Sequence, residues 1–311
     1  MRKYQEYYPH GIMFHRFHKH DQIGGSITAN NLEDIINIIG IDRIISPSKW
    51  IQKCIDNNLD NRDVCLTFDD CLKSQFNFAL PILKKYNLKA FFFVHSITFE
   101  NNYEYNELFY NLIYKKYTSF NIFFNDYLKK MKIDIDIFTT TQYLNFKDDL
   151  LSKFNNYTEK EVMYRYLRNI FFKNDEFNES LKNFFAPEIR QINKIESIWM
   201  DINDIKSLSK SGHYIGLHTH SHHINFLSLN YDQQKNEYEI NKKKLESIIN
   251  EKIQASSHPL GLYNNDTIKI LKSLDIICSF RSNTLIPSGH KKINPSFYEI
   301  ARNDVANINY C

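Results

Sequence analysis

The segment VCLTFDDCLKSQFNFALPILKKYNLKAFFFV, residues 64–94, decides the fold of this chain. It opens with an apolar run at 64–68, continues with helical periodicity over 73–86, and ends with an unbroken apolar run at 90–94. Strand, helix and strand at this spacing predict a parallel βαβ unit. A continuously apolar strand is typical of a parallel sheet that is covered on both faces. The segment therefore favours an α/β architecture.

The same alternation extends along most of the chain. Before this segment we expect a strand at 11–15, a helix at 30–39 with an Asn cap, and a helix at 46–57. After it, the pattern predicts helices at 201–210, 231–250 and 264–274 and strands at 213–217, 253–257, 276–280 and 298–301. About seven strands that alternate with helices predict a (β/α)-barrel-like fold.

Residues 99–197 interrupt this pattern. They are rich in Asn, Phe and Tyr and show helical periodicity without alternating strands. We therefore expect a largely helical insertion within a single domain that spans 1–311. Because it follows the strand at 90–94, it is expected at the end of the barrel that carries active sites. A lid, a substrate platform, a packing element and a homo-oligomer contact all stay open as its role.

Composition excludes several classes of protein. The net charge is +3, and no basic run is interleaved with aromatic residues, which argues against a nucleic-acid partner. No run of apolar residues is long enough for a transmembrane segment. The five cysteines are widely spaced, and the first ten residues contain no apolar stretch typical of a signal peptide. We therefore expect a cytoplasmic protein.

Polar residues with catalytic potential follow the predicted strands. Active sites of (β/α)-barrels lie at the carboxyl ends of the strands, so these residues are expected to share one face. They are His15, Asp69, Asp70, His218, His222, His258 and Arg302.

The stretch IGLHTHSHH, residues 215–223, holds four of the twelve histidines and suggests a metal site. Two histidines separated by three residues, together with a carboxylate from Asp69-Asp70, supply three ligands and leave positions open for water and substrate. The second carboxylate is then available as a base, and a nearby histidine as an acid. Taken singly, the Asp pair is more typical of a turn or helix cap, and the histidines could instead form a solvated loop or bind metal adventitiously.

These motifs resemble those of the polysaccharide deacetylases, the NodB-homology fold of carbohydrate esterase family 4. The likeness rests on TFDD at 67–70 and HTHSH at 218–222, and it extends to MFHRF at 13–17, KAFFF at 89–93, GHYIG at 212–216 and PLGLYN at 259–264. It covers about residues 11–96 and 199–304. The resemblance implies a distorted seven-stranded NodB-type barrel and a polysaccharide-deacetylase-like catalytic domain.

The resemblance also implies roles for individual residues. Asp69 would be the catalytic base, and Asp70, His218 and His222 would bind one divalent ion, most often Zn²⁺, with Co²⁺ or another ion in some members. Thr219 and Ser221 would brace the histidine loop, and a backbone N–H after Pro259 would stabilise the oxyanion. The implied reaction is hydrolysis of an N-acetyl or O-acetyl group on a sugar.

The chain departs from the family pattern at three positions. Cys71 replaces the glycine after the second Asp, and Ser257 stands where an arginine often orients the base. Arg302 and a solvent-mediated contact are the two candidates to replace that arginine. The histidine that supplies the general acid has no clear counterpart. Among His15, His258 and His290 we prefer His15, because its strand is expected to direct it toward the barrel mouth.

The expected substrate is an acetylated sugar that is nucleotide-linked, lipid-linked or free, as an intracellular precursor of a surface glycan. Two rivals stay open at this point. One is a deacylase of a non-sugar amide. The other is a catalytically degenerate barrel that binds glycan without turnover.

Overall fold

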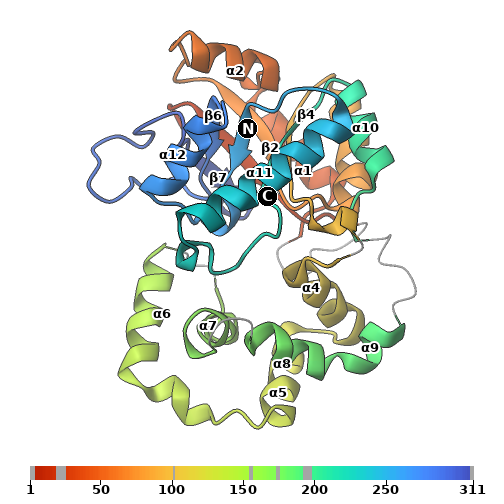
Figure 1. The fold of residues 1–311 in the computed structure, drawn as a ribbon, viewed down its shortest axis with the longest axis vertical. Helices are drawn as coiled ribbons and strands as arrows, with labels where there is room; N and C mark the ends of the chain where they lie inside the picture. Colours follow the sequence, from red (N-terminus) through yellow and green to blue (C-terminus); the bar gives the residue numbers. More distant parts are fainter. Residues whose placement is uncertain are drawn as a thin grey trace. The chain divides into compact units, whose positions relative to one another are not determined.

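Seven parallel strands form one sheet that nearly closes into a barrel (Figure 1). The computed structural model describes residues 4–18, 26–100, 102–153, 157–172, 176–191 and 198–308. The strand order is β6-β5-β4-β3-β2-β1-β7. The strands are β1 His10–Phe14, β2 Val64–Phe68, β3 Phe91–Val94, β4 Tyr214–Leu217, β5 Ala255–Ser257, β6 Cys278–Phe280 and β7 Arg302–Asp304. The predicted (β/α)-barrel-like fold is confirmed.

The segment that leads into β7 brings the two edges of the sheet together. Ile300 forms a parallel bridge with Phe280 of β6, and the N–H of Arg281 donates to the Ile300 carbonyl at 2.7 Å. Two residues later, Arg302 is in register with Gly11 of β1. The predicted last strand at 298–301 is therefore wrong in position, because the regular ladder with β1 begins only at Arg302.

The helices of the barrel unit follow the predicted order with shifted ends. They are α1 Ala29–Ile39, α2 Pro47–Ile55, α3 Leu80–Lys85, α10 Ile202–Lys210, α11 Tyr231–Ile249 and α12 Asn265–Ser273. Thr28, not Asn30, caps α1 and makes a capping box with Asn31. The helix expected at 73–86 contains a π-helical segment, Gln75–Ala79, before α3. Pro81 lies two residues after the end of this segment, and its missing N–H favours such a break in the α-helical pattern.

An apolar core closes the amino-terminal end of the barrel. Trp50, Ile51 and Cys54 of α2 belong to one buried cluster with residues of β2, β3, β5 and β6, including Phe93 and Phe280. In Figure 1, α2 lies beyond one end of the strands. The interior beside α2 is therefore apolar, whereas the polar residues of the candidate site follow the carboxyl ends of the strands.

Residues 104–195 form a second compact unit. Its helices are α4 Tyr105–Lys116, α5 Phe120–Lys130, α6 Thr141–Lys153, α7 Glu159–Tyr166, α8 Glu176–Phe184 and α9 Ala186–Gln191. Its core is aromatic: the fully buried ring of Phe123 has the rings of Tyr127, Phe184 and Phe185 within 6 Å between centroids. The largely helical insertion is confirmed, whereas one catalytic domain over 1–311 stays a prediction.

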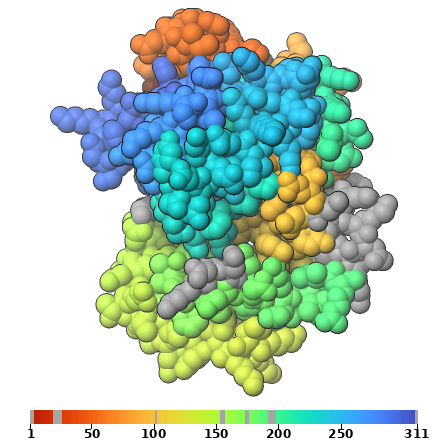
Figure 2. All heavy atoms as spheres, viewed as in Figure 1, coloured from red at the N-terminus to blue at the C-terminus, as the bar shows by residue number. Residues whose placement is uncertain are grey.

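Figure 2 shows α11 and α12 on the surface of the barrel unit. Among the helices that the structure describes, none combines the length and the apolar character needed to cross a bilayer.

Candidate active site

The turn after β2 presents two adjacent carboxylates. The N–H of Asp69 donates to the Phe14 carbonyl at 3.1 Å, which continues the β1–β2 pairing by one residue. Asp70 and Cys71 then adopt φ values of 74° and 58°. Residues that carry a side chain rarely adopt this left-handed backbone conformation, and such backbone strain is concentrated at functional sites. It turns the chain sharply and separates the directions of the two Asp side chains.

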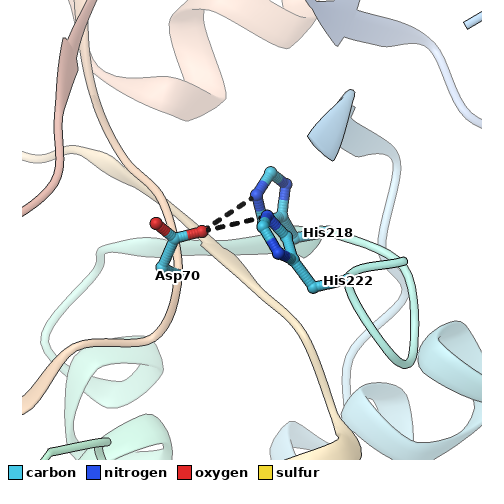
Figure 3. A group of neighbouring side chains, drawn as sticks. All are labelled: Asp70, His218 and His222. Carbon is cyan, nitrogen blue, oxygen red and sulfur yellow. Dashed lines mark ion pairs between the residues drawn. The ribbon is translucent and has the colours of Figure 1, made fainter. Parts of the chain in front are cut away.

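The loop after β4 brings two imidazoles to Asp70 (Figure 3). His218 follows β4 directly, and positive φ values at Thr219 (59°) and His222 (53°) curl the loop back on itself. The Nε2 atoms of His218 and His222 lie 3.2 and 3.4 Å from Asp70 Oδ1. The three candidate ligand atoms all lie within 4.8 Å of one another.

This cluster fits a divalent metal ion. Asp70 Oδ1 is buried and has no hydrogen-bond partner among the described residues, although two imidazole nitrogens face it. On its other side, His218 Nδ1 lies 2.7 Å from Ser257 Oγ and 3.2 Å from the Ser257 carbonyl. Such contacts orient a ligating imidazole and leave Nε2 for the metal. One carboxylate and two imidazoles are the donors of an open, catalytic type of zinc site.

Burial opposes ionisation of Asp70, but His218, His222 and His15 hold the pKa of its carboxyl well below the usual range. The carboxylate form is the one that binds a cation. The lowered pKa of Asp70 and the spacing of the three ligand atoms therefore both favour a bound cation.

Asp69 lies beside this cluster and is held by Arg302. Arg302 Nη1 and Nη2 donate to Asp69 Oδ1 and Oδ2, each at 2.7 Å, and both side chains are buried. Burial opposes ionisation of Asp69, but Arg302 and then His218 lower the pKa of its carboxyl below the ordinary value. Ser257, which stands where the family often has arginine, still contributes a hydroxyl 3.4 Å from Asp69 Oδ1.

Arg302 reaches Asp69 through the barrel interior. At the residue paired with it in β1, Gly11, an added Cβ would lie 3.0 Å from Arg302 Cγ, so the missing side chain makes room for the arginine. Arg302 Nε donates to the Arg281 carbonyl at 2.5 Å, and Nη1 lies 3.3 Å from Thr67 Oγ1. The Arg281 carbonyl and the Thr67 hydroxyl thus help to orient the guanidinium toward the Asp69 carboxylate.

Two more predicted residues, His15 and Ser221, lie next to strand β1 and in the histidine loop. His15 directly follows β1, its side chain is about one-third exposed, and its Nε2 lies 3.9 Å from Asp70 Oδ2. Ser221 lies between the two histidine ligands, and its Oγ donates to Glu237 Oε1 at 2.9 Å.

The remaining predicted residues are placed differently. His258 is fully buried, and its Nε2 lies 2.9 Å from the Tyr298 carbonyl, while its ring stacks on Tyr263 at 4.4 Å between centroids. These contacts make His258 a packing residue. Burial also lowers the pKa of its imidazole to about 3, so the ring is neutral. Thr219 Oγ1 is buried without a hydrogen-bond partner in the described part of the chain, so the expected bracing role is not seen there. Pro259 is buried at the start of a tight turn in which Leu260 has φ 54°.

Two further residues, Gln75 and His95, lie near the site. Gln75 is fully buried, and its Nε2 donates to the carbonyls of His15 (2.9 Å) and Asp69 (2.5 Å). His95 directly follows β3 and is buried with its ring 6.1 Å from that of His222. The rule that polar residues after barrel strands face the site applies to His95. No local pattern marks Gln75, because its partners are carbonyls of two different strand ends.

The sequence matches the profile described as polysaccharide deacetylase over residues 56–278, more than half of the chain. The chain therefore belongs to the polysaccharide deacetylase family. No curated protein matched the chain in the corresponding search.

Several solved structures share the fold. The Streptococcus pyogenes deacetylase PplD, in complex with acetate, is 16% identical, with 96% of this chain and 91% of that chain covered and a TM-score of 0.55. A de-N-acetylase from Aggregatibacter actinomycetemcomitans is 14% identical, with 96% of each chain covered and a TM-score of 0.54. IcaB from Ammonifex degensii is 13% identical, with 94% and 91% covered and a TM-score of 0.51. Family membership supports a carbohydrate deacetylase, and the Asp-His-His group agrees with the general metal dependence of that family.

Proposed function

We propose that the protein is a metal-dependent hydrolase that removes an acetyl group from the nitrogen of a sugar. The observation that carries the proposal is that the two adjacent carboxylates have different partners. Asp70 faces His218 and His222, whereas Asp69 is held by Arg302 beside them. A protein that only binds glycan needs no buried, ionised carboxylate next to a set of metal ligands.

A divalent ion held by Asp70, His218 and His222 would acidify water and polarise the acetyl carbonyl. Asp69 accepts the proton of the attacking water through Oδ2, which receives one bond from Arg302 and keeps a second lone pair, whereas Oδ1 accepts from both Arg302 and Ser257. In the turn after Pro259, the N–H groups of Gly261 and Leu262 donate to carbonyls. The N–H of Leu260 is therefore our candidate donor to the oxyanion.

His15 is the proposed general acid. When the C–N bond breaks, the leaving amine needs a proton, and His15 is the partly exposed histidine close to Asp70. The products are acetate and the free amine of the sugar. The proposed cofactor is Zn²⁺, with Co²⁺ or another divalent ion as the alternative.

The proposed substrate is a nucleotide-linked, lipid-linked or free acetamido sugar that serves as a precursor of a surface glycan. Support comes from the family and from the PplD structure, which was determined with acetate bound. A cytoplasmic location is part of this proposal, and cell fractionation tests it. Recovery of the native protein outside the cytoplasm would remove the precursor argument.

The deciding experiment measures acetate release and metal content together. Wild type should hold about one zinc or similar ion per chain and release acetate from an acetamido-sugar panel. Asp70→Ala should lose both, Asp69→Asn should keep the metal and lose most activity, and the exposed Asp34→Asn should change neither. His15→Gln should keep the metal and lower the rate about 10²-fold or more. Release only from non-sugar amides would favour a different deacylase, and metal without release from any substrate would favour a binding barrel.

A further inference from the structure

Two side chains of α11 hold the loop that carries both histidine ligands. Glu237 Oε2 accepts the backbone N–H groups of His220 (3.0 Å) and Ser221 (2.8 Å), and Oε1 accepts the hydroxyl of Ser221. One helical turn later, Asn241 accepts the N–H of His218 at 3.1 Å and donates to the Val94 carbonyl at 3.0 Å. Thus α11 contacts the loop at the first ligand and at both residues before the second.

The loop needs such support because its conformation is strained. Thr219 and His222 both have positive φ, a conformation that is unfavourable for residues that carry a side chain. Successive N–H groups that converge on one point form an anion-binding concavity. Here the anion is the carboxylate of Glu237, and bonds to a charged acceptor are stronger than neutral ones.

The opposite side of the loop is held by the segment after β3. The N–H groups of Ser96 and Ile97 both donate to the His220 carbonyl, at 3.2 and 3.0 Å. Ser96 Oγ also lies 3.0 Å from His220 Nδ1. His220, which does not face Asp70, therefore serves as an attachment point between the two ligands.

We propose that Glu237 is a positioning residue, which keeps the loop 218–222 in the shape that directs both imidazoles at Asp70. The inference rests on the proposed function, since it assumes that these imidazoles bind a cation. Groups outside the ligand set that orient the ligands typically contribute 10–100-fold to metal affinity. Glu237 acts on the loop backbone, so its loss should weaken metal binding without removing a ligand.

The test combines cobalt binding with hydrogen exchange. Purified wild type, Glu237→Ala, Glu237→Gln and the control Glu239→Ala are stripped of metal and titrated with Co²⁺, whose visible bands report tetrahedral ligation. Glu239 lies on the same helix but is exposed and pairs with Lys235 at 3.5 Å. In parallel, exchange at the amides of residues 218–223 is measured in the metal-free proteins.

We expect the Kd for Co²⁺ to rise about 10–100-fold in Glu237→Ala and less in Glu237→Gln, whose amide oxygen still accepts the two N–H groups. Exchange at His220 and Ser221 should accelerate in the same order, and the control should match wild type in both measurements. If Glu237→Ala fails to fold, Glu237→Gln carries the comparison.

Unchanged cobalt affinity in Glu237→Ala, or equal losses in Glu237→Ala and Glu239→Ala, would overturn the inference. Unchanged amide exchange would overturn it as well. Failure of the wild type to bind Co²⁺ would instead remove the proposed function, and the exchange data alone would then decide whether Glu237 holds the loop.

Discussion

Arg302 and Asp69 form a buried, two-pronged ion pair across 233 residues of sequence, with both N–O distances at 2.7 Å. Arg302 is the first residue of β7, and Asp69 is the first residue after β2. The strand that completes the barrel thus supplies the cation that holds the candidate base. Pairing of β7 with β1 is therefore needed both to complete the barrel and to place a positive charge beside Asp69.

Removing the cation of this pair should destabilise the protein strongly. Arg302→Met leaves the Asp69 carboxylate buried without its main partner, and breaking a buried pair in this way typically lowers the free energy of unfolding by about 3–5 kcal/mol. Urea unfolding measures the change. The double variant Asp69→Asn, Arg302→Met should recover part of the loss, because no unpaired charge is then left in the barrel.

The matched control is the exposed pair Arg62–Asp42, whose side chains are 61% and 71% exposed. Arg62→Met should change the free energy of unfolding by about 1 kcal/mol or less. Similar losses in Arg302→Met and Arg62→Met would contradict a special role for the buried pair.

Gly11 should tolerate no side chain, because Arg302 passes over it. The Cβ of Gly11→Ala would lie 3.0 Å from Arg302 Cγ and 3.1 Å from Thr67 Cγ2. We expect a loss of about 1–3 kcal/mol in the free energy of unfolding, typical of overpacking, together with lower deacetylase activity as the guanidinium moves. Thermal unfolding and acetate release measure the two effects.

Thr67→Ser, combined with Gly11→Ala, tests whether steric overlap at residue 11 causes the loss of stability. It removes Cγ2 but keeps the hydroxyl that lies 3.3 Å from Arg302 Nη1. Adding it to Gly11→Ala should restore part of the stability. A Gly11→Ala protein as stable and active as wild type would show that the interior is not tightly packed there.

Metal should stabilise the folded chain through Asp70. A ligand that binds only the folded state at 100 times its Kd raises the free energy of unfolding by about 2.7 kcal/mol. Chelation of the wild type should therefore lower its Tm, and Zn²⁺ should restore it. Asp70→Ala should show one Tm under both conditions, while Asp34→Asn should follow the wild type. A zinc effect of equal size in Asp70→Ala would place the metal elsewhere.

Stability should fall in acid because histidines are buried in their neutral form. Burial lowers the pKa of both His10 and His213 to about 4, against about 6.5 in an unfolded chain. Between these values the unfolded chain binds protons that the folded chain does not. The stabilisation is therefore complete above about pH 6.5 and is lost as the pH falls toward 4, by up to about 1.4 kcal/mol per pH unit for each histidine.

His213→Asn isolates one of these groups. The backbone N–H of Ala90 donates to His213 Nδ1 at 3.3 Å, and an asparagine oxygen at that place accepts the same bond without titrating. Urea unfolding from pH 7.5 to 4.5 should give a shallower loss of stability in this variant. The exposed His290→Asn should keep the wild-type slope, and a wild-type slope in His213→Asn would argue that His213 is not the group concerned.

Much of the candidate site was within reach of the sequence because strand periodicity is local. Apolar runs at 64–68 and 90–94 define neighbouring parallel strands without reference to distant residues. Parallel strands of one barrel end on the same side, so the carboxylates after β2 and the histidines after β4 had to share a face. Asp70, His218 and His222 do converge in the structure, within the reach of one ion.

Other features depended on tertiary structure. His258 also follows a strand, yet its ring is bound to the Tyr298 carbonyl, because the direction of a side chain is set by packing and not by its place in the chain. The contacts of Glu237 with the histidine loop depend on how α11 packs against it. Sequence periodicity marks α11 as a helix but not which of its polar residues faces inward.

The sequence by itself determined the seven-stranded alternation, the helical insertion and the pairing of Asp69-Asp70 with the histidine loop, since hydrophobic periodicity and strand direction are encoded within short segments. Only the tertiary structure decided that Arg302 holds Asp69. That contact requires barrel closure and the register of Arg302 opposite Gly11, where a missing side chain lets the arginine cross the interior. Register across a closing edge is a long-range property, and no local pattern in the sequence specifies it.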